Sequence, residues 1–60
     1  MPEPATLKRL IGRVVEIDRY DGGHDHGHLL NATRRTLWLV DGDEDRFVPL
    51  SDVASLRAAS

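Results

Sequence analysis

The 60-residue chain contains no cysteine and only three aromatic residues, Tyr20, Trp38 and Phe47. The absence of cysteine excludes disulfide bonds and thiol redox chemistry, and it is compatible with a reducing compartment. The scarcity of aromatic side chains argues against a stacking platform for single-stranded nucleic acid, which commonly places several rings on one face.

The chain also lacks a long apolar run and a large excess of charge of one sign. No stretch approaches the roughly 20 apolar residues that a membrane-spanning helix needs, and the first twelve residues contain no apolar signal-peptide region. We therefore expect a cytoplasmic protein without a membrane partner. The formal net charge of −2 excludes a global field that attracts nucleic acid, so any such binding must come from local patches.

Sixty residues allow one domain of marginal stability, because a chain of this length buries only about 60% of the surface that its unfolded form exposes. Domains this small are commonly stabilised by disulfides, a metal or oligomerisation, and without cysteine the last two remain. Two prolines oppose a helix at the start of the chain. We therefore assign residues 1–5 to a flexible lead-in and residues 6–60 to a single domain.

The clearest strand signals lie between Thr36 and Leu50. Apolar runs at 37–40 and 47–50 flank a polar loop at 41–45 that contains glycine, which predicts a β-hairpin. Side chains alternate across a strand, so one face is expected to hold Leu37, Leu39, Val48 and Leu50. The other face is expected to hold Trp38, Val40 and Phe47. Both faces are apolar, so one must cover the core and the other must be covered by another segment or another molecule.

The segment before the hairpin predicts a short helix and two strands. Leu7, Leu10 and Ile11 recur at helical spacing between Thr6, a potential cap, and Gly12, which suits a helix C-terminus. Period-two alternation predicts strands over residues 12–20 and 24–33. Their expected core residues are Val15, Ile17 and either Leu29 or Leu30.

Two interpretations remain open after Leu50. Ser51 and Asp52 can cap a short helix that directs Val53 and Leu56 inward, or they can begin a turn that leads to a closing strand over residues 54–57. We favour the strand, because a small sheet needs an edge partner.

This order of elements resembles the Sm-like and broader SH3-like barrels. The residues that carry the resemblance are Leu7, Leu10, Gly12 to Val15, Gly27, Leu29, Leu37, Leu39, Val48 to Val53 and Leu56. The resemblance implies a mainly β fold in which a short N-terminal helix is followed by a five-stranded, strongly bent small barrel.

The chain departs from the Sm pattern at the positions that hold RNA in that family. Pro49, Leu50 and Ser51 stand where Sm proteins carry Arg-Gly-Asn, and residues 33–36 replace the Asp and Asn of their second turn. The layout is also similar to the small Rof-type inhibitors of the Rho terminator, which bind a protein. A further similarity is to PRC-barrel modules, which have an acidic hairpin followed by a strand resembling Val-Pro-Leu-Ser-Asp-Val. All three resemblances imply a module that binds something.

The histidine tract is the most unusual local feature. His24, His26 and His28 alternate, so an extended backbone places their imidazoles on one face about 6 to 7 Å apart, with Asp21 and Asp25 nearby. Such a tract can bind Zn²⁺ or another transition metal. The alternative is a solvated glycine-rich loop, and ligands that alternate along one strand do not by themselves converge on a tetrahedral centre. We therefore expect no cofactor and keep a transition metal as the alternative.

Charged residues suggest two further surfaces. Arg13, Arg34 and Arg35 can bind phosphates, although we favour the alternative that they are solvent-facing arginines that pair with the ten acids. The acidic residues between 41 and 45 lack the spacing of a calcium loop and are expected to form a hydrated turn that discourages aggregation.

No nucleophile elbow, phosphate loop or other catalytic signature is present, so we do not expect an enzyme. The leading interpretation is a non-catalytic binding module with a regulatory role, which binds a protein partner or a second copy of itself through Trp38, Val40 and Phe47. Nucleic-acid binding through Arg13, Arg34 and Arg35 is the first alternative. Metal binding through His24, His26 and His28 is the second.

Overall fold

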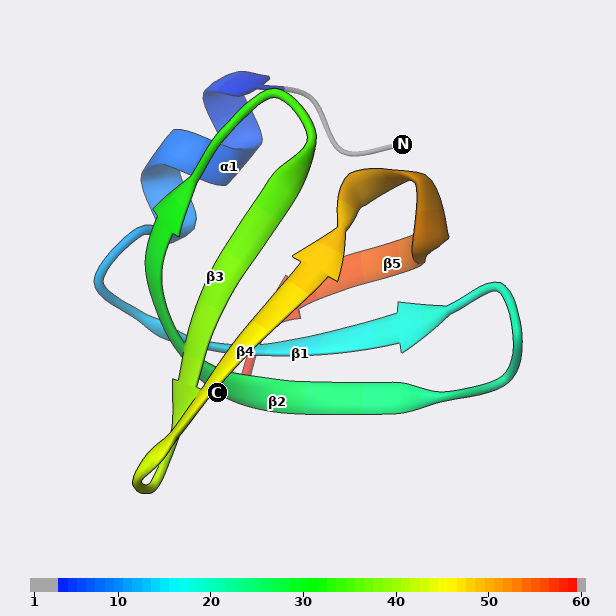
Figure 1. Cartoon of the computed structure of the whole chain (residues 1–60). Coiled ribbons are helices and arrows are strands. Elements are labelled where there is room, and N and C mark those ends of the chain that lie inside the picture. Colours follow the sequence, from blue (N-terminus) through cyan, green and yellow to red (C-terminus); the bar gives the residue numbers. More distant parts are fainter. Residues whose placement is uncertain (1–3, 60) are drawn as a thin grey trace.

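The computed structural model describes residues 4–59, with the side chains from residue 7 onward. The elements in chain order are α1 (Pro4–Leu10), β1 (Val14–Arg19), β2 (His24–Ala32), β3 (Thr36–Asp41), β4 (Glu44–Pro49), the 3₁₀ turn η1 (Leu50–Asp52) and β5 (Val53–Ala58) (Figure 1). The strands form one antiparallel sheet in the order β4-β3-β2-β1-β5, which is not closed by hydrogen bonds. The expected mainly β fold, with one short helix before five strands, is confirmed.

Strand β2 is the longest strand and is bent, so that it pairs with two neighbours in turn (Figure 1). Its residues up to His28 pair with β1, and those from His28 to Ala32 pair with β3. A Cβ atom at Gly27 would lie 2.7 Å from the carbonyl oxygen of Val40. Only glycine therefore permits β2 and β3 to approach so closely where the sheet folds over.

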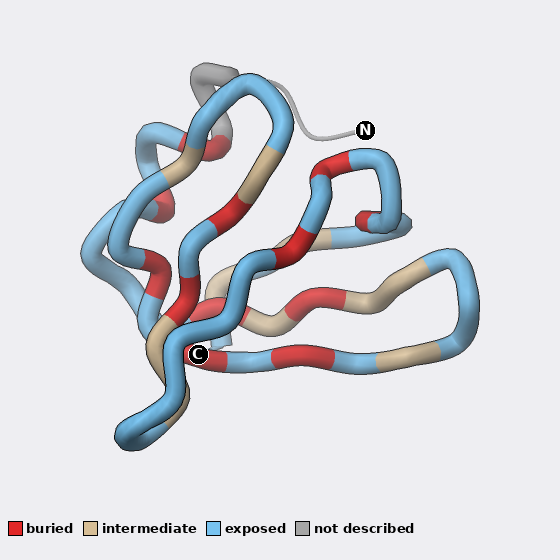
Figure 2. Tube along the Cα trace, in the orientation of Figure 1, coloured by how far each residue is buried: buried red, intermediate tan, exposed pale blue. Residues whose placement is uncertain are grey.

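The folded sheet encloses an entirely aliphatic core, to which α1 contributes two leucines. Its buried side chains are Leu7, Leu10, Val15, Ile17, Leu29, Leu37, Leu39, Val48, Leu50 and Val53. Buried and exposed positions alternate along β1, β2 and β3 (Figure 2). The expected core faces of the first strand and of the hairpin are thus confirmed. In β2 the core residue is Leu29, whereas Leu30 remains 42% exposed.

The helix begins earlier than expected. The lead-in assigned to residues 1–5 is wrong for Pro4 and Ala5, which form the first helical residues, and Thr6 lies inside the helix instead of capping it. Proline fits the first position because its fixed φ suits a helix and its missing N–H has no partner there. Residues 1–3 lie outside the described part of the chain. Gly12 ends this region with a φ of +91°, as its place after the helix predicts.

The loop of the central hairpin is shorter than the five residues expected at 41–45. Asp41 pairs with Glu44, so only Gly42 and Asp43 form the turn. Gly42 has a φ of +62°, which the first position of a tight hairpin turn favours. Most of the acidic residues therefore belong to the strands.

The chain after Leu50 adopts the favoured alternative. The 3₁₀ turn η1 leads into β5, which pairs with β1 and buries Val53 fully and Leu56 in part. The alternative of a C-terminal helix is excluded for residues 53–58.

We predict that Gly27→Ala lowers the free energy of unfolding by about 1–3 kcal/mol, because its methyl group meets backbone atoms that cannot move without breaking the β2–β3 pairing. Urea unfolding followed by circular dichroism measures the change. His26→Ala, at an exposed position of the same strand, is the control and should change stability by less than Gly27→Ala. Equal stabilities of the two variants would contradict the role given to Gly27.

Candidate functional site

All three aromatic side chains lie outside the core. Trp38 is 37% exposed, Phe47 63% and Tyr20 70%. Trp38 and Phe47 are cross-strand partners in β3 and β4, and their rings stack with centroids 5.8 Å apart and an interplanar angle of 21°. The indole N–H of Trp38 donates to Oδ1 of Asp45 at 3.3 Å. The aromatic pair is thus held in one arrangement on the outer face of the edge hairpin.

The strand register extends this apolar surface towards β1. His28 lies opposite both Val14 and Val40, so the three side chains share the outer face of the sheet. Val14 is 45% exposed, and Val40 is half-buried. We define the outer apolar patch as Val14, Trp38, Val40 and Phe47. The expectation that Trp38, Val40 and Phe47 face away from the core is confirmed.

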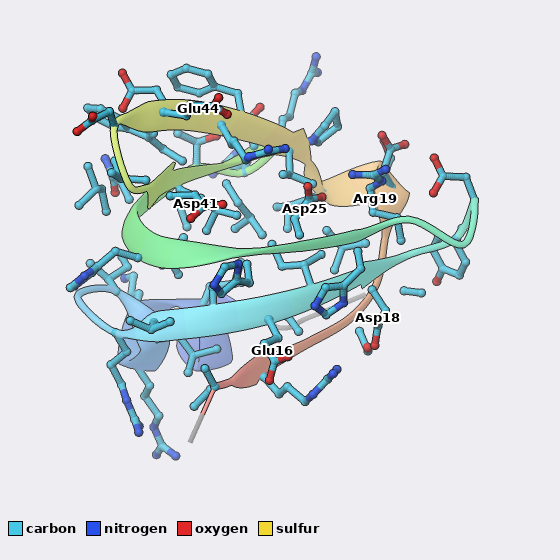
Figure 3. The ribbon with its side chains drawn as sticks, turned by 90° about the horizontal axis from the view of Figure 1, so that it is seen from below. Glu16, Asp18, Arg19, Asp25, Asp41 and Glu44 are labelled. Atoms are coloured by element: carbon cyan, nitrogen blue, oxygen red, sulfur yellow. The ribbon has the colours of Figure 1, made fainter. Side chains whose placement is uncertain are left out.

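On the opposite, inner face of the sheet, Asp25 is the one buried charged residue among those the structure describes, and its side chain is 3% exposed. Its carboxylate accepts a hydrogen bond from Nη1 of Arg19 (Figure 3). It also accepts one from Nη1 of Arg46 at 3.4 Å. Arg19 also contacts Asp21 at 3.3 Å. Two guanidinium groups therefore compensate the carboxylate for its loss of water.

This ion cluster forms part of an open hollow of about 350 Å³ between the β1–β2 turn, β4 and η1. Phe47 lies in its lining together with Asp25 and Arg46. No buried side-chain nitrogen or oxygen among the described residues lacks a hydrogen-bond partner. Because its charges satisfy one another, the cluster is explained as a polar closure of the core and does not by itself indicate a ligand.

The histidines occupy the outer face of β2 and are exposed, as their alternation predicts. Each has a different neighbour. Nδ1 of His24 lies 2.9 Å from Oδ1 of Asp18, Nε2 of His28 lies 2.6 Å from the carbonyl oxygen of Gly12, and Nδ1 of His26 lies 3.9 Å from Oδ2 of Asp41. Within residues 4–59, no group of three or more His, Asp and Glu side chains is arranged to hold a metal ion. The structure gives the metal interpretation no support.

Asp18 is the centre of a second ion cluster, which links β2, β1 and β5 on the outer face (Figure 3). Besides its contact with His24, it accepts hydrogen bonds at Oδ2 from Arg57 at 2.8 Å and from Ser55 at 3.0 Å. Hydrogen bonds from His24, Arg57 and Ser55 hold the pKa of Asp18 well below its ordinary value.

The arginines divide into two groups. Arg19, Arg46 and Arg57 are all paired with acids, whereas Arg9, Arg13, Arg34 and Arg35 are exposed and form no ion pair with any acid that the structure describes. Arg13 follows α1, and Arg34 and Arg35 lie in the β2–β3 turn. The three candidate phosphate ligands therefore come from two separate connections.

The buried role of Asp25 was missed by the sequence interpretation, which treated it as an acid near the histidines. The alternation of β2 indicates that Asp25 faces the core, because Asp25 shares its face with Gly27 and the core residue Leu29. A carboxylate at such a position needs a cationic partner.

Comparisons with protein-family models, curated proteins and solved structures found no significant match to this chain. Over residues 4–59, no helix combines the length and the apolar character needed to cross a membrane. The chain is therefore placed in the class of small, mainly β proteins, and its function has to be argued from its own geometry.

We predict that Asp18→Asn destabilises the protein at pH 7 more than at pH 3. A carboxylate with a depressed pKa stabilises the folded state above the ordinary value of about 3.9, and this contribution is lost as the pH falls below that value. Thermal unfolding at the two pH values measures the difference in Tm between variant and wild type. Asp43→Asn is the control, because Asp43 forms no side-chain hydrogen bond with the described residues; a Tm difference for Asp18→Asn that does not narrow in acid would contradict the assignment.

We further predict that Asp25→Ala lowers the free energy of unfolding by about 1–3 kcal/mol, because the half-buried Arg19 and the more exposed Arg46 lose their shared acceptor. Asp52→Ala, at an exposed position of the same hollow, should have a smaller effect. Urea unfolding distinguishes the two, and an equal loss in both variants would show that burial of Asp25 is not the cause.

Proposed function

We propose that this protein is a non-catalytic binding module with a regulatory role, of the Sm-like or SH3-like barrel type, and that it docks a protein partner on the outer apolar patch. One observation carries the proposal: the aliphatic core is complete without the aromatic residues, and two of these stack in the open on the edge hairpin. One helix before five bent antiparallel strands, with a 3₁₀ turn before the last, supports the resemblance to these barrels.

The aromatic pair has the properties of an interface anchor. Tryptophan and other aromatic side chains are enriched among the residues that contribute most to protein–protein affinity. Stacking with Phe47 and the hydrogen bond to Asp45 already order the Trp38 side chain, so that binding costs less conformational entropy. The patch therefore offers a preorganised apolar surface of the kind that a protein partner can cover.

The test compares Phe47→Ser with wild type for capture of proteins from a nuclease-treated extract of the producing cells. Tyr20→Ser is the matched control, because it removes another exposed ring outside the outer apolar patch. We expect wild type and Tyr20→Ser to retain the same partner, and Phe47→Ser to bind the identified partner at least about tenfold more weakly.

A second readout uses the single tryptophan of the chain. The purified partner should shield Trp38 fluorescence from quenching by iodide. Equal retention of the partner by Phe47→Ser, or unchanged quenching in the complex, would contradict docking on this patch.

A second candidate function is nucleic-acid binding. It is favoured by Arg13, Arg34 and Arg35, which are exposed and unpaired with the described acids, while the arginines of the ion clusters are all engaged. Phosphate binding by such groups is strongly salt-dependent.

We expect labelled single-stranded RNA, if it binds, to lose affinity steeply as salt rises, and Arg34→Gln/Arg35→Gln to reduce this dependence. Fluorescence anisotropy from low to physiological salt measures both. Lys8→Gln is a control at an exposed cation in α1. Absence of binding at low salt would remove this candidate.

A further inference from the structure

The two edges of the open sheet differ in how they are protected against pairing with another strand. Edge strand β4 carries Glu44, Asp45 and Arg46, and it ends in Pro49. The N–H of Leu50 donates to the carbonyl oxygen of Arg35, which directly precedes β3. The alternation of the ladder therefore directs the backbone of Pro49 outward, where its missing N–H cannot support a new strand. Charges and an outward proline are devices that prevent edge-to-edge association.

Edge strand β5 has no outward proline and fewer charges than β4; its register with β1 shifts at Ala54, so its regular edge runs from Ser55 to Ala58. Its sequence from Val53 to Ala58 contains no proline or glycine and a single charge, Arg57. Arg57 contacts Asp18 at 2.8 Å and Glu16 at 4.0 Å within its own sheet. Glu44 and Arg46 of β4 are also paired, so the main differences between the two edges are Pro49 and the number of charged residues.

The backbone of β5 also has free hydrogen-bonding groups. The N–H of Ala59 donates to Val14 at 3.0 Å, which sets the alternation of the β1–β5 ladder. In this alternation the backbone N–H and C=O of Arg57 point to β1, whereas those of Leu56 and Ala58 point away from the sheet. No backbone group among residues 4–59 bonds to these outward groups.

We propose that β5 pairs antiparallel with β5 of a second copy of this chain, about a two-fold axis at Leu56, so that two five-stranded sheets become one continuous sheet. The inference goes beyond the proposed function, because it rests on β5 and not on the outer apolar patch. Each edge supplies the N–H and C=O groups that the other lacks.

The absence of like-charge contacts favours a second copy in this register. With the axis at Leu56, each Ser55 lies opposite Arg57 of the other copy. On the outer face, Asp18, Ser55 and Arg57 of the other copy then lie side by side on three neighbouring strands, so that no two like charges face each other. An axis at Arg57 would place two guanidinium groups directly opposite one another. For a 60-residue domain without disulfides, the added burial also supplies the stabilisation that its size makes scarce.

Proline substitution at Ala58 tests the edge directly. Ala58→Pro removes an outward N–H and leaves the hydrogen bonds to β1 intact, whereas Ala58→Val keeps the N–H. Sedimentation equilibrium should find wild type and Ala58→Val as dimers and Ala58→Pro, with an unchanged circular dichroism spectrum, dissociating at least about tenfold more readily. Phe47→Ser should dimerise as wild type does, which separates this proposal from the outer patch.

Single cysteines test the register without requiring that Ala58→Pro folds, because the chain contains no natural cysteine. Hydrogen-bonded antiparallel pairs have Cα atoms about 5.5 Å apart, within the reach of a disulfide. Leu56→Cys should form a disulfide-linked dimer under mild oxidation. Ala54→Cys and Ala58→Cys should not do so alone but should cross-link when mixed.

A wild type that stays monomeric at the highest soluble concentration would overturn the proposal. Dimers lost in Phe47→Ser would also overturn it, because they would assign self-association to the outer patch. Equal cross-linking of all three single-cysteine variants would exclude the Leu56 register.

Discussion

The fold depends on one close approach between backbones, that of β2 and β3 at Gly27 and Val40. Because Gly27 has no Cβ, β2 can leave β1 and continue along β3, and the sheet folds over its aliphatic side chains. The same bend fixes the two faces of β2. The histidines remain outside, while Asp25 and Leu29 lie inside, one at the rim of the core and the other within it.

The fold is stabilised by aliphatic packing and by polar clusters, and the aromatic residues belong to neither. Asp25 binds two arginines on the inner face, and Asp18 binds Arg57, Ser55 and His24 on the outer face. The Asp18 cluster connects strands that are neighbours in the sheet. The Asp25 cluster also reaches β4, which meets β2 only because the sheet is curved. Since the core contains no aromatic ring, the stacked Trp38 and Phe47 remain exposed on the outer face.

Local regularities were predictable from the sequence, and long-range contacts were not. Period-two alternation correctly assigned both faces of the hairpin, and the need of a small sheet for an edge partner correctly favoured a final strand. The helix start was misplaced because Pro4 was interpreted only as a helix breaker. The tight turn at Gly42 was missed because its acidic neighbours resemble loop residues, although they pair in the ladder. Asp25 is paired with Arg19 and also with Arg46, 21 residues away, and only the fold over Gly27 brings Asp25 and Arg46 together.

The unequal edges have a consequence for how large an assembly can become. If both edges accepted strands, β4 of one molecule could pair with β5 of the next, and such head-to-tail contacts extend into fibres unless the rotation happens to close a ring. Pro49 and its charged neighbours block that route. If a molecule can pair only through β5, its one free edge is covered in the first association, and growth stops at two subunits. If β5 pairs as proposed, the size of the assembly is thus set by the residues of the opposite edge, β4.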